Sequence, residues 1–190
     1  MKYYILPFLV IFLFSCQQKE DNSLATFLDH KVEFESQNVT SLNKNFEVTL
    51  PKSWKWKHEE YGDTVVENIH AASPKNKEGF ISLITIEKLQ SIFGAKDLSE
   101  DVDLFKIQIE KNEGWKLIDS GETNFLNYPA QFIHYKSDTG TKGESESITF
   151  ILETDKKGVF YYLNAGGSQS ESLEKEMATM LEILSSFKKK

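Results

Sequence analysis

Arginine is absent from this chain of 190 residues, in which all 22 basic side chains are lysines. The sequence therefore lacks the planar guanidinium that binds phosphates and carboxylates through two parallel hydrogen bonds. The formal net charge is −7, and a negative surface opposes the phosphate contacts on which nucleic-acid affinity depends. Together, the missing arginine and the acidic balance argue against a nucleic-acid partner.

Cysteine is almost absent as well, with Cys16 as the single copy. One thiol excludes an intrachain disulfide and a metal cluster built on several thiolates. The four histidines do not pair at the spacings of metal ligands, and no glycine-rich phosphate loop, HExxH motif or nucleophile elbow occurs. We therefore expect no cofactor, no metal site and no catalytic residues.

Two groups of titratable residues have simple structural interpretations. His134 alternates with Phe132 in a predicted strand, so we expect a partly buried or surface side chain. Glu100, Asp101 and Asp103 cluster where a predicted helix begins, and the helix dipole favours their charged form there. Only a buried histidine or carboxylate with a polar partner in a cleft would favour an enzyme.

Residues 1–15 are typical of an export signal. Lys2 supplies a single charge, and a run of 12 apolar residues follows, which is too short to cross a bilayer permanently. The run ends in Leu13-Phe14-Ser15-Cys16, which resembles the bacterial lipobox. The resemblance implies cleavage between Ser15 and Cys16 and acylation of Cys16, since stable anchoring takes more than one acyl chain. The alternative is a plain secretory signal with an incidental cysteine.

Residues 16–45 are predicted to be a tether followed by a semi-ordered arm. Residues 17–23 are polar and lack apolar anchors, as flexible linkers do. This tract also resembles the surface-export tethers of one group of Gram-negative bacteria, although an ordinary spacer would have the same composition. The arm, 24–45, mixes helical and strand spacing of its apolar residues. We expect it to pack partly on the domain that follows.

Residues 46–190 are predicted to form one α+β domain, with a single antiparallel sheet of about six strands flanked by helices. Alternating or continuous apolar residues bounded by glycine and proline mark the strands. The predicted extended segments are Phe46–Leu50, Val65–Ala72, Phe80–Lys88, Trp115–Phe125 with a bulge at Gly121, Pro129–Lys136, Ser147–Glu153 and Val159–Ala165. Residues 155–158 are predicted to be the hairpin loop between the last two.

Two helices complete the predicted domain. Asp97 and Glu100 resemble a capping box at the start of a helix over 97–112. A second helix is predicted after a turn at Gly166-Gly167, with Ser168 as its cap and the lysines 188–190 complementing its C-terminal dipole. Its apolar face comprises Leu173, Met177, Met180, Leu181, Leu184 and Phe187.

Three segments in order resemble the PsbP-like superfamily. They are the entry strand 46–54 (FEVTLPKSW), the stretch 127–132 (NYPAQF), and the pair 160–165 and 183–187 (FYYLNA and ILSSF). The resemblance covers about residues 46–187 and implies an antiparallel sheet between helices. It also implies a mostly non-enzymatic family of accessory subunits, a Ran-binding protein and bacterial lipoproteins, without shared catalytic residues.

An aromatic cluster follows the first strand of this domain. Trp54 fits the core position of the family, and Trp56 follows two residues later, between Lys55 and Lys57. Exposed aromatic residues beside lysines often anchor partners, so Trp56 and Tyr61, with Lys55 and Lys57, are our candidate partner-binding residues on a predicted loop. The alternative is that Trp56 packs under the N-terminal arm.

Two functions from different classes fit these features. The first is a lipid-anchored binding or accessory module of the bacterial cell envelope that contacts a protein or envelope ligand and catalyses no reaction. Its location would be the outer membrane, on either the periplasmic or the surface face. The second is a carrier of a small molecule or glycan in a pocket between sheet and helix. A deep apolar cavity would favour the carrier, and an enzyme ranks third.

Overall fold

The structure is a computed structural model that describes residues 23–59, 64–138 and 143–190. The predictions made for Ser15, Cys16 and Tyr61 lie outside these residues. Within the described ranges, no helix is long and apolar enough to cross a membrane.

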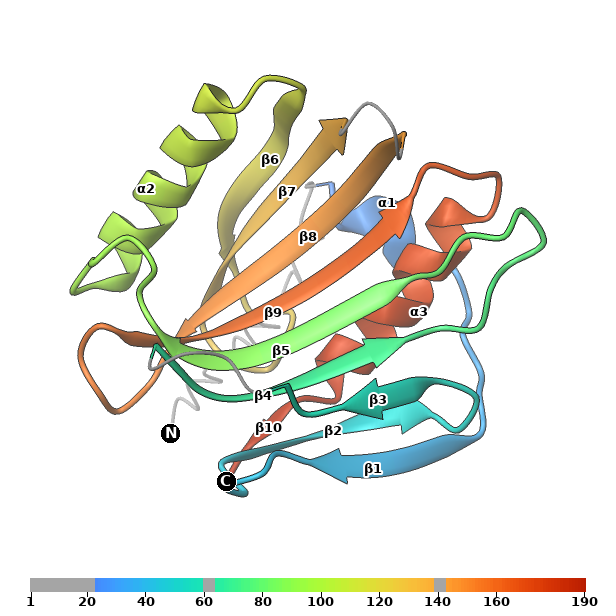
Figure 1. Cartoon of the computed structure of the whole chain (residues 1–190), viewed down its shortest axis with the longest axis horizontal. Coiled ribbons are helices and arrows are strands. Elements are labelled where there is room, and N and C mark those ends of the chain that lie inside the picture. The colour runs from blue at the N-terminus through green and yellow to red at the C-terminus, as the bar shows by residue number, and fades with distance from the viewer. Residues whose placement is uncertain (1–22, 60–63, 139–142) are drawn as a thin grey trace, which may run out of the picture.

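A seven-stranded sheet forms the centre of the molecule, with each strand antiparallel to its neighbours (Figure 1). In spatial order its strands are β3 (Lys55–Lys57), β4 (Val65–Ala72), β5 (Leu83–Gln90), β9 (Val159–Ser168), β8 (Glu144–Glu153), β7 (Ala130–Asp138) and β6 (Trp115–Thr123). The predicted bulge at Gly121 is wrong, because Gly121 pairs in register with Phe132 and the register shifts between Leu117 and Asp119 instead.

A second, three-stranded sheet is formed by β1 (Ser36–Thr40), β2 (Phe46–Pro51) and β10 (Lys188–Lys189), with β2 in the middle. The α+β class with antiparallel strands and a C-terminal helix is confirmed. The prediction of a single sheet of about six strands is wrong, because β1 and β10 pair with β2 apart from the large sheet. Both strands are short and polar, so neither has an apolar alternation that marks it in the sequence.

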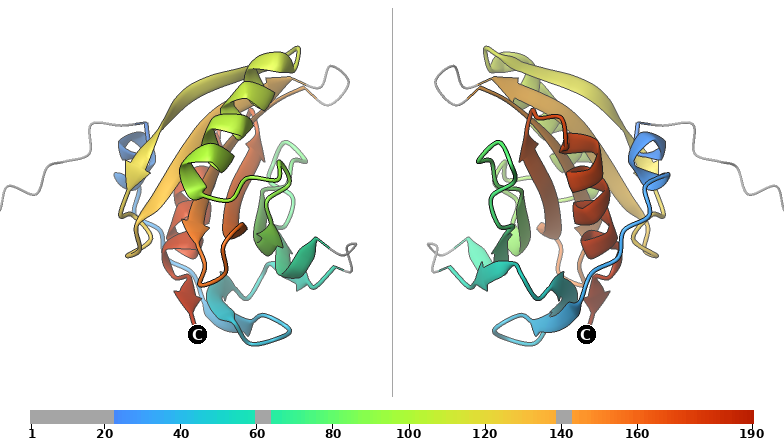
Figure 2. Two further views of the ribbon diagram at one scale, coloured as in Figure 1. Left: turned by 90° about the vertical axis from the view of Figure 1, so that its left-hand side faces the viewer. Right: turned by 90° about the vertical axis from the view of Figure 1, so that its right-hand side faces the viewer.

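Helices cover the two faces of the large sheet (Figure 2). On one face α3 (Leu173–Ser185), the small sheet and α1 (Ala25–Leu28) enclose the main core, in which Phe46, Phe150 and Leu184 are fully buried. On the other face α2 (Leu98–Lys111) packs on a smaller core around Ile109, Ile133 and Ile151. Because α2 covers only part of its face, the region of β3, β4 and β5 is left open there.

The capping signal at the start of α2 is confirmed. Asp97 Oδ1 accepts a hydrogen bond from the Glu100 amide at 3.0 Å, and Glu100 Oε2 accepts one from the Lys96 amide at 3.0 Å. Asp101 lies in the first turn of α2, as expected, but it is fully buried. Its carboxylate accepts hydrogen bonds from the hydroxyls of Ser91 and Tyr162, which fastens α2 to the sheet.

The apolar face predicted for the last helix is confirmed, since Leu173, Met177, Met180, Leu181, Leu184 and Phe187 are all buried. The predicted ends of this helix are wrong. Gly166 and Gly167 continue strand β9, and the N-cap is Ser172 instead of Ser168. The lysines that were expected to complete the helix form β10, where Lys188 pairs with Glu47.

The arm predicted from the N-terminal pattern packs closely on the domain. Leu24 and Phe27 belong to the main core, and Val39 of β1 is buried opposite Val48 of β2. Residues 29–35 connect α1 to β1, and Phe34 among them packs against the main core. The described arm is thus part of the folded structure from Ser23 onward.

Candidate functional site

Strand β3 carries three of the four candidate partner-binding residues at the edge of the large sheet. Lys55, Trp56 and Lys57 form this strand, so the predicted loop is wrong at these positions. Trp54 lies in the bend before β3 and is buried, whereas the Trp56 side chain within β3 is 40% exposed. The aromatic neighbour of Trp56 is His58, whose ring lies edge-on at 5.5 Å.

An open groove of about 480 Å³ runs from β3 across β4 and β5. We call it the β3–β5 groove, and its lining residues are Lys55, Trp56, Lys57, Glu59, His70, Ala71, Ala72, Leu83, Ile84 and Thr85. Its surface is mostly apolar, and Leu83 is 46% exposed there. The structure therefore brings Trp56, Lys55 and Lys57 together around one groove, while Tyr61 lies outside the described residues.

Charged groups occupy the rim of this groove. Lys57 pairs with Glu59, and His70 Nε2 lies 3.2 Å from Glu87 Oε1. The other lysine of the rim, Lys55, is exposed. An apolar floor with a polar rim is the usual composition of a recognition surface. The partner-binding role of these residues stays a prediction.

A buried cluster around His134 was missed by sequence reasoning. His134 is 3% exposed, and its two ring nitrogens contact Ser23 Oγ and Glu146 Oε1, each at 2.7 Å. Lys136 Nζ lies 3.5 Å from the other oxygen of Glu146, and the Ser23 amide donates to Asp119 Oδ2 at 2.8 Å. His134 and Lys136 alternate on β7, and Glu146 of β8 is the cross-strand partner of Lys136. In the sequence, only this pairing of opposite charges could have indicated an ion pair.

This cluster holds the N-terminal arm against the sheet. Burial alone would raise the pKa of Glu146, but the hydrogen bond and charge of His134, together with Lys136, outweigh it and lower the pKa below its ordinary value. A buried histidine with a carboxylate beside a cleft of about 550 Å³ is also the arrangement that would favour an enzyme. However, both ring nitrogens already contact protein groups, so a substrate would have to displace Ser23.

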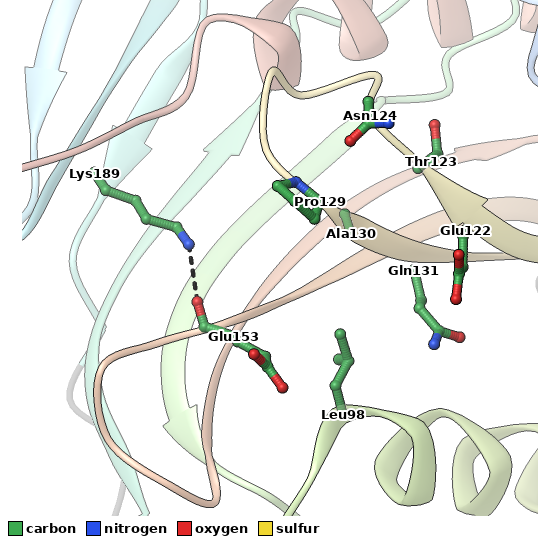
Figure 3. A pocket seen from close by; sticks show the side chains of 9 residues that line it. All are labelled: Leu98, Glu122, Thr123, Asn124, Pro129, Ala130, Gln131, Glu153 and Lys189. Carbon is green, nitrogen blue, oxygen red and sulfur yellow. Dashed lines mark hydrogen bonds between the residues drawn. The ribbon is translucent and has the colours of Figure 1, made fainter.

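A third hollow lies where the N-terminal end of α2 approaches the sheet and β10 (Figure 3). We call it the Lys189 pocket. Its volume is about 530 Å³, and it is lined by Leu98, Glu122, Thr123, Asn124, Pro129, Ala130, Gln131, Glu153 and Lys189. Like the other two hollows described here, it is open to the surface and is not the deep apolar cavity that would favour the predicted carrier.

The ammonium of Lys189 is held at one wall of this pocket. Its Nζ donates to the Glu153 carbonyl at 2.8 Å, a bond drawn in Figure 3. The same ammonium lies 4.9 Å from the ring centre of Tyr128 and 5.5 Å from that of Tyr161. Burial lowers the pKa of Lys189, and the charge of Glu153 offsets part of this effect. No sequence pattern singled out this lysine, because its surroundings come from four separate strands.

Comparisons with known proteins show the fold and nothing finer. No family model matches the chain, and no curated protein matches it. Among solved structures, cyanobacterial PsbP (CyanoP) from Synechocystis is similar with a TM-score of 0.57 and 11% identity, covering 84% of this chain and 95% of that one. The Saccharomyces cerevisiae Ran-binding protein Mog1p has a TM-score of 0.52 and 8% identity, over 82% of this chain and 96% of the other.

A mycobacterial protein has the same architecture. LpqN of Mycobacterium tuberculosis, described as involved in cell envelope biogenesis, has a TM-score of 0.50 and 11% identity, over 87% of this chain and 95% of its own. These similarities extend over nearly the whole of each neighbour and nearly all of the described residues. The chain therefore has the PsbP-like fold.

Proposed function

We propose that this protein is a lipid-anchored accessory module of the bacterial cell envelope that binds a partner in the β3–β5 groove and catalyses no reaction. The observation that carries the proposal is the exposed Trp56 side chain beside an open, mostly apolar groove. Tryptophan is enriched among the residues that dominate binding energy, because it removes a large apolar area from water while its indole N–H can still donate a hydrogen bond.

The neighbours in fold are consistent with a binding role. One is the cyanobacterial PsbP protein and one is described as binding Ran. The third neighbour, LpqN, is connected with the cell envelope, which agrees with the signal and lipobox pattern of residues 1–16. Non-catalysis is supported by the His134 cluster, in which one imidazole nitrogen contacts Ser23 of the arm and the other contacts Glu146 of β8.

The groove is tested by comparing two tryptophans that are two residues apart. Trp56→Ala should leave the melting temperature nearly unchanged, because the side chain is 40% exposed. It should also weaken the capture of envelope partners in a crosslinking pull-down from intact cells. The loss for a central anchor corresponds to about 2 kcal/mol of binding free energy.

Trp54→Ala is the matched control. Trp54 is 7% exposed, so its replacement should reduce stability by about 3–5 kcal/mol. If Trp56→Ala melts as early as the Trp54 variant, or captures every partner as the wild type does, the binding role of the groove is rejected.

The anchor is tested separately from the groove. The intact mass of protein extracted from membranes should correspond to a chain that begins at Cys16 and carries acyl groups. The variant Cys16→Ser should leave the membrane fraction, because a single polar side chain cannot replace acyl chains that each contribute about 0.8 kcal/mol per buried CH₂. A mature chain beginning at another residue would refute the anchor and leave the groove proposal intact.

A further inference from the structure

We propose that the Lys189 pocket binds a small zwitterion, a free α-amino acid or a short peptide with a small apolar side chain. The carboxylate of the ligand would contact the Lys189 ammonium, and its ammonium would contact the carboxylates at the other walls of the pocket. The pocket is built from α2, β6, β7, β8 and β10, away from β3 and Trp56. The inference is independent of the role proposed for the β3–β5 groove.

The ammonium of Lys189 has hydrogen-bonding capacity left for a ligand. An ammonium has three N–H donors, and one of these donates to a described acceptor, the Glu153 carbonyl. The faces of Tyr128 and Tyr161 fix the position of the side chain without accepting a conventional hydrogen bond from it. A partly buried ammonium with donors still available at the wall of a pocket is a good partner for a ligand carboxylate.

Positive and negative side chains lie at different walls of the pocket. Figure 3 shows Lys189 at one wall, the Glu122 carboxylate and the Gln131 amide at the opposite wall, and the Glu153 carboxylate between them. Glu122 and Gln131 are cross-strand partners on β6 and β7, so their side chains lie next to each other on one face. This wall offers acceptors for a positively charged group together with an amide that can accept or donate.

Ligands with a charge of only one sign fit this pocket less well. An anion without a positive charge would meet Lys189 favourably but would also lie close to two carboxylates. A cation without a negative charge would satisfy the carboxylates but would be repelled by Lys189. A molecule that carries a carboxylate and an ammonium can place each charge toward groups of the opposite sign, which is the general condition for electrostatic complementarity.

The size and the remaining lining limit the side chain of the ligand. The volume of about 530 Å³ lies within the range of small-molecule pockets and is ample for an amino acid or a dipeptide. Leu98, Pro129 and Ala130 supply the apolar part of the lining. These groups favour a small apolar side chain over a long charged one.

The test is a calorimetric titration of the full chain with L-alanine, L-leucine and dialanine, and with N-acetylalanine and alaninamide as probes that each lack one of the two charges. We expect at least one zwitterion to bind at about 10 mM ligand, and both capped probes to bind about tenfold more weakly, since each loses a charged hydrogen bond. A comparison of dialanine with the free amino acids distinguishes the two sources of the zwitterion.

Three variants locate the binding. Lys189→Met removes the ammonium but keeps an unbranched stem on the tyrosine rings, and it should weaken binding about tenfold or more. Glu122→Gln changes an exposed residue and should weaken binding without affecting the fold. Lys188→Met, one residue away on the same strand and exposed, should bind like the wild type.

The proposal is overturned if no zwitterion binds at this concentration, or if the capped probes bind as well as the zwitterions. It is also overturned if Glu122→Gln and Lys188→Met behave alike. The melting temperature of each variant is measured first. If Lys189→Met is unfolded, two measurements still test the proposal: the binding of the zwitterions to Glu122→Gln, and the binding of the capped probes to the wild type.

Discussion

Replacing Phe187 with alanine tests whether the region between the two sheets holds the fold together. Phe187 is 2% exposed and follows α3 directly. Its ring centre lies 5.3 Å from that of Tyr161 in the large sheet and 5.6 Å from that of Phe46 in the small sheet. Tyr128 completes the cluster at 6.2 Å. This one side chain thus contacts both sheets.

The expected loss of stability follows from these contacts. Truncation of a buried phenylalanine costs about 3–5 kcal/mol, and aromatic pairs contribute about 0.5–1.5 kcal/mol beyond burial. With three ring neighbours, Phe187→Ala should lie in the upper half of the range. A loss of about 4–5 kcal/mol should lower the melting temperature by roughly 8–20 °C, at about 2–4 °C per kcal/mol.

Urea titration followed by tryptophan fluorescence measures this loss. Leu42→Ala, at a residue that is 71% exposed, is the control and should stay within about 0.5 kcal/mol of the wild type. Phe187→Leu should lose less than the alanine variant, because it keeps most of the volume. A loss below about 1.5 kcal/mol for Phe187→Ala, at an unchanged urea dependence, would refute the contribution that we assign to this cluster.

Two further predictions concern the ion pair and one glycine. The pKa of Glu146 is lower in the folded state than its ordinary value of 4.5, so its stabilising contribution is present above about pH 4.5 and is lost as pH falls through the folded pKa. Glu146→Gln should therefore be about 1–3 kcal/mol less stable than the wild type at pH 7. This difference in the free energy of unfolding should become smaller in urea titrations toward pH 3. A difference that stays constant with pH would contradict the assignment. A Cβ added at Gly114 would lie 2.7 Å from the Asp138 carbonyl oxygen, whereas one at Gly79 would meet nothing within 4 Å. Since φ is positive at both glycines, each alanine variant should lose about 1–2 kcal/mol of stability. Gly114→Ala should lose at least about 1 kcal/mol more than Gly79→Ala, as measured by thermal melting. Equal losses would show that the chain shifts freely at Gly114.

Elements with a local signal in the sequence were predicted well. Strand β4 has the predicted bounds Val65–Ala72, since its apolar run is stopped by Ser73-Pro74. The capping pair Asp97 and Glu100 marks the start of α2 correctly. These features depend on residues within a few positions of one another. A single sequence therefore contains the information that is needed to place them.

Elements that depend on distant partners were predicted poorly. The pattern of β1 is polar, and its position is determined by pairing with β2. Gly166 and Gly167 resemble a turn, but in β9 they allow close approach of the Ser147 hydroxyl and the Leu173 side chain, which would lie 3.0 and 3.1 Å from an added Cβ.

The candidate sites follow the same division. Trp56 and its two lysine neighbours are consecutive in the sequence, so their common place on β3 follows from local sequence, whereas the burial of Trp54 in the bend before β3 depends on the main core. The His134 cluster joins residues of the arm, β6, β7 and β8, and the Lys189 pocket joins four strands and a helix. No spacing in the sequence brings these residues together. They could be recognised only after the strand order was known.

Strand β10 also determines when the molecule can finish folding. Its lysines pair with Glu47 and Phe46 of β2, and α3 supplies the side chains that cover Val48 and Leu50. A nascent chain that has released β1 and β2 therefore exposes an apolar strand until α3 and β10, more than 120 residues later, have also been synthesised. The small sheet closes only after these distant elements are present. A chain of this kind can remain unfolded long enough to pass through a membrane channel, and the proposed export to the envelope requires that property.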